Sequence, residues 1–209
     1  MSTSSLYGIR KDYVGEELVE YQNSWYFTPI IMRILPEKYI PDEIATPYGY
    51  KKSIIGIGGE DIWRKTNDKI NKCQNTPDRI CWEMSNQQIF FTKDKKCIAD
   101  SIRKFVEQNK EYERSEEDNL SPLEREHIIE RFNEIAQDIE ELNEEEYPHF
   151  VFKNTSCDDG VEYWFQNYNE ETDEYEEKSL KEWDKFLAEF VVIQDGNITD
   201  FISNLNYEY

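Results

Sequence analysis

The chain has 209 residues and carries 45 Asp and Glu against 24 Lys and Arg, which gives a formal net charge of −21 at pH 7. Such a charge repels phosphate groups, so we expect the protein not to bind DNA or RNA. No apolar run is long enough to cross a membrane, and the first residues lack the basic start and hydrophobic stretch of a secretory signal. We therefore expect a cytoplasmic protein without a membrane segment.

The negative charge is concentrated in one part of the chain. Residues 111–190 hold 27 acidic and 7 basic residues, whereas residues 1–110 hold 15 acidic and 17 basic ones. This division separates a near-neutral part, 1–110, from an acidic part, 111–209, and the two form either separate lobes or one compact domain. The 14 Tyr, 11 Phe and 5 Trp supply apolar area for a core, although hydrophobic residues make up only 38% of the chain.

The near-neutral part predicts helices mixed with short strands. Thr28 and Pro29 suit the start of a helix whose Ile30, Ile31, Ile34 and Leu35 form one buried stripe. In chain order, the expected elements are strand or irregular structure over 1–24, a helix from Thr28 to Leu35, a proline-rich loop over 36–50, a short buried strand over 53–57, helices over 60–72 and from Thr76, a strand over 87–92 and an amphipathic helix over 94–110.

The acidic part opens with the polar stretch 111–119, which is the best candidate for a boundary between lobes. Ser121-Pro-Leu-Glu124 then has the pattern of a capping box with proline at the first helical position. The expected elements are a long helix from this box to about Glu145, a hairpin of 149–154 and 161–168, an acidic connector over 170–177, a helix from Ser179 to Phe190, and a last strand over 191–194 followed by a turn. The fold class is α+β, with amphipathic helices and short antiparallel strands or hairpins.

The residues that usually carry chemistry do not form a recognisable site. The four cysteines include no C-x-x-C pair, and His127 and His149 lie far from them in sequence. The segment Gly56–Gly59 lies between an expected strand and an expected helix, but Asp61 replaces the third glycine of a dinucleotide fingerprint. We therefore expect no catalytic residue, no cofactor and no metal site.

A row of carboxylates follows the long helix at every fourth residue. The row consists of Glu126, Glu130, Glu134 and Asp138, and Glu141 and Glu145 continue the same outer face. Like charges at this spacing destabilise a helix by a few tenths of a kcal/mol per pair, so neutralising them should stabilise it slightly. Successive members lie about 6 Å apart along the axis. This spacing is close to that of phosphates along a nucleic-acid strand, although an acidic face that is only solvated has the same pattern.

The expected hairpin carries a run of aromatic residues, which are Tyr163, Trp164, Phe165 and Tyr168. Alternation along a strand places Trp164 on the face opposite Tyr163 and Phe165, so one aromatic face is hard to bury. Tyr and Trp rimmed by carboxylates are typical of an anchor on a protein partner. Packing of both faces against helices is the alternative.

These patterns favour a non-enzymatic inhibitor that binds and blocks a basic protein. The expected partner is a nuclease, a toxin or a nucleic-acid-binding defence protein, as for toxin-immunity proteins and for phage anti-defence proteins that imitate DNA. One alternative is a small enzyme or ligand-binding domain with a pocket in 1–110, near Gly56–Gly59 and Trp63. Another is a structural or oligomerisation protein that uses the apolar stretch Trp25–Leu35.

Overall fold

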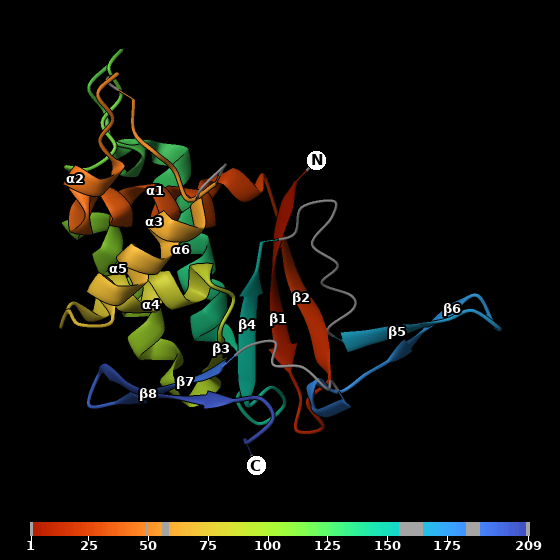
Figure 1. Cartoon of the computed structure of the whole chain (residues 1–209). Helices are drawn as coiled ribbons and strands as arrows, with labels where there is room; N and C mark the ends of the chain where they lie inside the picture. The colour runs from red at the N-terminus through yellow and green to blue at the C-terminus, as the bar shows by residue number, and fades with distance from the viewer. Residues whose placement is uncertain (1, 49, 56–58, 155–164, 183–188, 208–209) are drawn as a thin grey trace.

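The computed structural model describes residues 2–48, 50–55, 59–154, 165–182 and 189–207. These ranges contain a mixed β-sheet with helices gathered on one side of it (Figure 1), which confirms the α+β class. None of the described helices has both the length and the apolar composition needed to span a membrane.

The elements follow the chain in this order. The helices are α1 (Thr28–Tyr39), α2 (Pro41–Ile44), α3 (Gly59–Ile70), α4 (Thr76–Ser85), α5 (Lys95–Gln108) and α6 (Glu126–Glu141), with 3-10 turns at η1 (Ser24–Tyr26), η2 (Thr92–Asp94), η3 (Pro122–Glu124) and η4 (Leu180–Glu182). The strands are β1 (Thr3–Ile9), β2 (Gly15–Gln22), β3 (Ile89–Phe91), β4 (His149–Lys153), β5 (Gln166–Asn169), β6 (Glu174–Glu177), β7 (Glu189–Gln194) and β8 (Asn197–Ser203).

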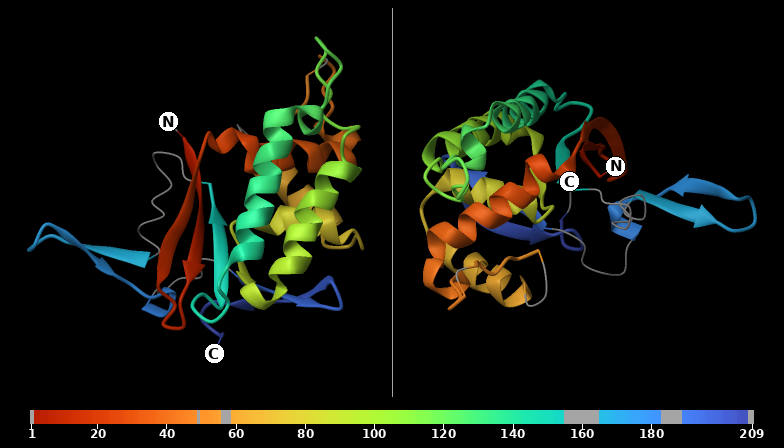
Figure 2. Two further views of the ribbon diagram at one scale, coloured as in Figure 1. Left: turned by 180° about the vertical axis from the view of Figure 1, so that it is seen from behind. Right: turned by 90° about the horizontal axis from the view of Figure 1, so that it is seen from above.

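Six of the strands form one sheet with the order β2-β1-β4-β3-β7-β8. Neighbouring strands are antiparallel except β3 and β7, which are parallel. The strands β5 and β6 pair only with each other and form a separate two-stranded sheet. Figure 2 shows the helices on one face of the large sheet and the small sheet extending away on the other side.

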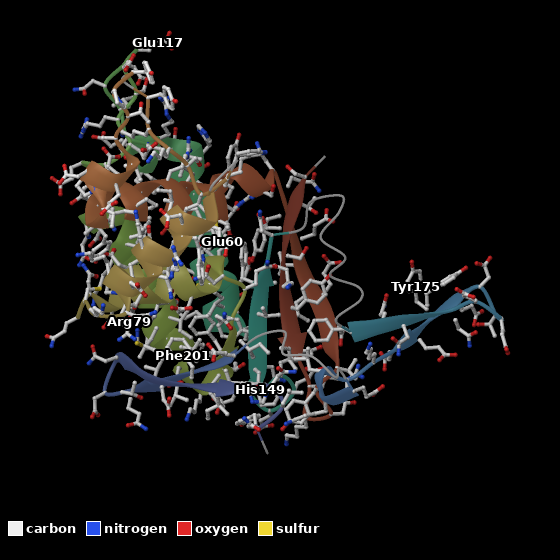
Figure 3. All side chains as sticks on the ribbon, viewed as in Figure 1. Glu60, Arg79, Glu117, His149, Tyr175 and Phe201 are labelled. Carbon is white, nitrogen blue, oxygen red and sulfur yellow. The ribbon has the colours of Figure 1, made fainter. Side chains whose placement is uncertain are left out.

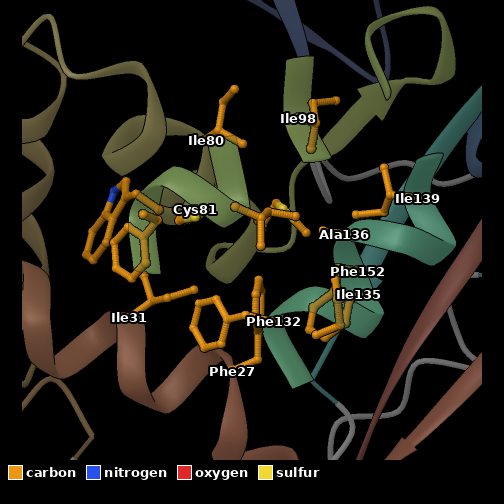
Figure 4. Close-up of a cluster of buried hydrophobic side chains, with 14 of the residues drawn as sticks. Phe27, Ile31, Ile80, Cys81, Ile98, Phe132, Ile135, Ala136, Ile139 and Phe152 are labelled. Atoms are coloured by element: carbon orange, nitrogen blue, oxygen red, sulfur yellow. The ribbon is translucent and has the colours of Figure 1, made fainter. Parts of the chain in front are cut away.

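The main core lies between the helices and the sheet (Figure 4). Phe27, at the start of α1, contacts Phe132 of α6 and Phe152 of β4, with ring centroids 4.7 and 4.8 Å away. Aromatic pairs at such distances add stability beyond the area that they bury. The sequence leaves open whether 1–110 and 111–209 are separate, and the structure places residues of both ranges in one sheet and one core.

A second apolar cluster covers the opposite face of the sheet. Ile9, Ile89 and Val151 point to this side and pack with Phe165 and Leu180 from the segments after β4 in the chain. Strand β4 is consequently buried at every residue, because helices cover one face and this cluster covers the other.

Several local predictions are confirmed. The apolar stripe of α1 is buried as expected, and α3, α4 and α5 begin and end within two residues of the bounds predicted for them. The capping box is present, since the Ser121 hydroxyl accepts from the Leu123 N–H at 3.3 Å and the Glu124 carboxylate accepts from the Ser121 N–H at 2.9 Å. This box caps the short turn η3, and α6 begins directly after it.

Two predictions in the near-neutral part are wrong. The loop expected from residue 36 begins later, because α1 continues through Pro36 to Tyr39 and Pro36 is itself buried. Burial of the ring offsets the hydrogen bond that an internal proline removes. The strand expected at 53–57 is absent over 53–55, where Ile54 instead packs beside a small cluster of α2 and α3 residues and Ile55 is exposed. Residues 56–58 lie outside the described ranges.

Three predictions in the acidic part are wrong as well. The expected hairpin of 149–154 with 161–168 does not form, because β4 is paired on both edges, with β1 and β3. The expected acidic connector over 170–177 is the turn and second strand of the β5–β6 hairpin. Phe190, expected in a helix, lies in β7, and residues 183–188 before it are outside the described ranges.

Glu83 of α4 is a buried carboxylate beneath the sheet. Burial raises the pKa of this carboxyl group to about 7, and a hydrogen bond with Asn86 and the charge of Arg79 offset part of that rise. The folded state then binds more protons than the unfolded state between the ordinary value of 4.5 and about 7. Stability is therefore expected to fall as the pH rises through this window.

Replacing Glu83 with Gln tests this expectation. Gln keeps the shape and cannot ionise, so Glu83→Gln should stabilise the fold by roughly 3 kcal/mol near pH 8 and have little effect near pH 4.5. Thermal melting at both pH values measures the difference. Glu107→Gln, on an exposed position of α5, is the control and should show no such pH dependence. If Glu83→Gln changed the melting temperature equally at both pH values, ionisation of Glu83 would not be the cause of the pH dependence.

Candidate functional site

The carboxylate row predicted on the long helix is only partly a free surface. Glu126, Glu130 and Glu134 are exposed along α6, whereas Asp138 is half-buried. Glu141 is the last residue of α6, and Glu145 lies in the turn after the helix, so it does not continue the helical row. The prediction that the helix extends to Glu145 is therefore wrong, although that side chain is exposed.

Asp138 has a structural contact. Its carboxylate accepts a hydrogen bond of 2.6 Å from the hydroxyl of Tyr21 in β2, and burial together with this carboxylate raises the pKa of Tyr21. The Arg131 guanidinium lies 5.3 Å from the centroid of the Tyr21 ring and donates to Glu134 at 3.0 Å. These contacts join the middle of α6 to β2. Asp138 therefore stabilises the packing of the helix on the sheet and is not a free surface charge.

The acidic surface that stands apart from the body is the β5–β6 hairpin, defined here as the arm, residues 166–177. Figures 1 and 2 show the arm extending away from the sheet and the helices. It carries six acidic residues and no basic residue, and every side chain except Asn169 is exposed. The acidic residues are Glu170, Glu171, Asp173, Glu174, Glu176 and Glu177.

Local sequence explains the turn at the tip of the arm. The Asn169 side chain accepts from the N–H of Glu171 at 2.9 Å, and the Asn169 carbonyl accepts from the N–H of Asp173 at 2.9 Å. Asp173 has a φ of 59°, a left-handed conformation that Asp and Asn adopt more readily than most residues. A signal for this hairpin was thus present in the sequence as an Asn turn between two short runs that each contain a tyrosine.

Two tyrosines face each other across the arm. Tyr168 and Tyr175 are directly opposite in the strand register, with ring centroids 5.3 Å apart, and they are 46% and 54% exposed. The Tyr168 hydroxyl donates to Asp173, and this hydrogen bond raises the pKa of the phenol. Figure 3 shows Tyr175 well away from the rest of the protein. The pair forms an aromatic patch with carboxylates around it.

The base of the arm is fixed to the body. Phe165 is only 2% exposed and stacks on Tyr7 of β1 with centroids 5.7 Å apart. A side chain at Gly15 would lie 2.5 Å from the Phe165 ring, so glycine is needed there for this packing. Arg10 binds Glu177 at 3.0 Å at the end of the arm. Of the four aromatic residues predicted as anchors, Phe165 belongs to the core, Tyr168 is exposed, and Tyr163 and Trp164 lie outside the described residues.

The two histidines lie in different surroundings, one buried and one exposed. His149 is buried among aromatic rings, and its Nε2 lies 3.3 Å from the Tyr207 hydroxyl. Burial lowers the pKa of His149 to about 4, so the imidazole is neutral at pH 7. His127 is exposed on α6 and lies against the ring of Tyr26, with centroids 5.0 Å apart.

A surface cavity lies along the near-neutral part, away from Trp63, and residues 56–58 of the predicted pocket are outside the described ranges. A cavity of about 1060 Å³ lies between the start of α4 and α5, with Lys93, Lys96 and Lys104 in its lining. Trp63 is instead packed on Trp82, and its indole N–H donates to Asn86 at 2.7 Å. The described residues contain no group of three or more His, Cys, Asp and Glu side chains placed to hold a metal ion.

No protein-family model, curated protein or solved structure matches this chain. On the described surface, the arm and the exposed part of α6 are both acidic.

Substitutions on α6 distinguish the structural carboxylate from the exposed ones. Asp138→Ala removes the acceptor of the buried Tyr21 hydroxyl and should lower the free energy of unfolding by roughly 1–2 kcal/mol. Glu130→Ala, on an exposed position of the same helix, should change it by less than about 0.5 kcal/mol. Urea unfolding of both variants measures the difference. If Asp138→Ala were as stable as the unmodified protein, the contact would not support the fold.

Proposed function

We propose that this protein is a non-enzymatic inhibitor that binds a basic protein and blocks its functional surface. The observation that carries the proposal is the arm, an exposed acidic hairpin with a central pair of tyrosines. The proposed partner is a nuclease, a toxin or another nucleic-acid-binding protein, because such proteins present cationic surfaces that a polyanion can cover.

The energetics of the arm favour a role in binding. An isolated two-stranded hairpin is only marginally stable in water, and the described residues of the arm gain little from packing on the body. The rings of Tyr168 and Tyr175 pack on each other with centroids 5.3 Å apart, and the Tyr168 hydroxyl donates to Asp173, so these side chains lose less freedom on contact with a partner than unpacked ones would. Rigid aromatic side chains surrounded by polar residues are frequent hot spots of protein interfaces.

Charge supplies the second part of the mechanism. The acidic residues of the arm and the exposed carboxylates Glu126, Glu130 and Glu134 of α6 create a field that attracts a basic protein over distances beyond contact. Such a field raises the rate of association, and it is weakened by salt. The mechanism is the same whether the protein is a toxin-immunity protein or a phage anti-defence protein. In both cases the proposed protein covers the functional surface of its partner and does not modify the partner chemically.

Removing the two tyrosine rings tests the role of the arm. The protein with Tyr168→Ser and Tyr175→Ser is compared with the unmodified protein for capture of proteins from the native host and for inhibition of the captured protein. We expect a basic partner whose dissociation constant rises at least tenfold for this double variant, because interface hot spots contribute about 2 kcal/mol or more each.

A second pair of exposed tyrosines provides a matched control. Tyr48 and Tyr50 stack on each other with centroids 6.3 Å apart and are 84% and 61% exposed, but they lie outside the arm. The variant with Tyr48→Ser and Tyr50→Ser should bind and inhibit as the unmodified protein does. Equal loss in both double variants would exclude a specific role of the arm, and a captured partner without a basic surface would exclude the proposed mechanism.

A further inference from the structure

The outer edge of β2 faces a groove beside α6. Strand β2 is the last strand on its side of the sheet, so one of its edges has no neighbouring strand in the described part of the chain. Residues 19–22 of β2 and residues between Glu130 and Asp138 of α6 line a groove of about 980 Å³. An open edge beside a helix is a common place for a protein to receive an added strand.

The backbone directions along β2 show which groups are available. In an antiparallel strand, alternate residues direct both backbone groups to the same side. The Asn23 N–H donates to the Ser2 carbonyl at 3.0 Å on the β1 side, whereas the Gln22 carbonyl accepts from Arg131 of α6 at 2.7 Å. Gln22 therefore points away from β1, and Glu20, two residues earlier, points the same way. No hydrogen bond from the described residues reaches the backbone of Glu20 on that side.

Arg131 shows what kind of group the groove accepts. Its guanidinium donates to the edge carbonyl of Gln22 and to the carboxylate of Glu134, and it lies over the ring of Tyr21. One cation thus bonds to the strand edge and to the helix at the same time. The edge next to this contact offers the same combination of backbone groups and carboxylates.

Carboxylates lie on both sides of this edge. Glu130 and Glu134 are exposed on the α6 side. Tyr21 faces α6, so Glu20 faces the opposite side, where Glu17, paired with Tyr7, also lies. Strand β2 contains no basic residue. A strand added here therefore meets Glu17 and Glu20 on one face. On the α6 face it meets Glu130, Glu134 and Asp138, which outnumber Arg103 and Arg131 of the same groove, so the net charge there is negative as well.

We infer that the edge of β2 binds an extended Lys- or Arg-rich segment of the partner protein as an added strand. Backbone hydrogen bonds to the outward groups of β2 hold the segment, and its cationic side chains meet the carboxylates on the two faces. A second copy of this chain is disfavoured at the edge, since it would bring the same negative charges together. The inference rests on the proposed function for the existence of a basic partner, and it uses a surface other than the arm.

A synthetic peptide tests the edge directly. The probe is a short peptide of alternating lysine and threonine, titrated into the full chain while backbone amide signals are followed by NMR. We expect shifts centred on Glu20 and Gln22, together with slower hydrogen exchange of the Glu20 amide. The same peptide with alternate backbone nitrogens methylated keeps its charge but cannot pair, so it should bind about tenfold more weakly. Equal binding of the two peptides would overturn the inference, because it would mean that charge alone holds them.

Two substitutions at one position separate the backbone from the charge. Glu20→Pro removes the outward N–H while leaving the bonds to β1, and Glu20→Gln removes only the charge. We expect Glu20→Pro to weaken peptide binding much more than Glu20→Gln does. Should Glu20→Pro fail to fold, the methylated peptide still decides the question on the unmodified protein.

Three results would contradict the inference. An amide of Glu20 already protected in the free protein would mean that the chain itself occupies the edge, and self-association in place of peptide binding would mean that a second copy does. Shifts confined to the arm would place the peptide elsewhere. The arm variants, with β2 intact, should bind the peptide normally, so failure of this inference and failure of the proposed function can be told apart.

Discussion

Strand β4 pairs with β1 on one edge and with β3 on the other, and every one of its residues is buried. This strand comes from the acidic part of the sequence and completes a sheet whose neighbouring strands come from the near-neutral part. Strands β2 and β1 lie on one side of β4, and strands β3, β7 and β8 lie on the other. Without β4, these two groups would not form one sheet that buries its apolar residues under the helices. The position of β4 also constrains the next strands of the chain, since a strand with both edges paired cannot accept another neighbour. The strands β5 and β6 do not join β4 but pair with each other, outside the main sheet.

The distribution of charge depends on the same arrangement. A core closed on both faces of the sheet has little space for carboxylates, because burying an ionised group without a partner is costly. Glu83 is an exception, and the raised pKa of its carboxyl group expresses that cost. Many acidic residues are consequently at the surface, among them residues of α6, of the edge strand β2 and of the arm. The repulsion among them is tolerated there because water and salt screen it. The same repulsion is relieved when a basic surface approaches.

Local structure could be predicted from the sequence where a short pattern determines it. The stripe of α1 and the capping box at Ser121 are examples, because helix periodicity and capping depend on residues three or four positions apart. Strand partners could not be predicted in this way. The run before Asn154 and the run around Tyr168 both have strand character, but pairing depends on which edges remain free after the sheet forms. The structural role of Asp138 could not be predicted either, because it depends on a contact with Tyr21, which lies 117 positions away in the sequence.

Both candidate surfaces border strand β2, the arm at its start and the groove at its end. The arm leaves the body next to the start of β2, where Phe165, Gly15 and Glu17 line one surface cavity, and Figure 1 shows it extending beyond that edge of the sheet. On the proposed function, a partner that spans β2 contacts the arm and the β2 edge together. Binding at the first contact raises the effective concentration for the second, so we expect the proposed partner to be held far more tightly than a peptide that uses one contact alone. Weak binding of a peptide at the β2 edge is thus compatible with tight binding of the whole partner.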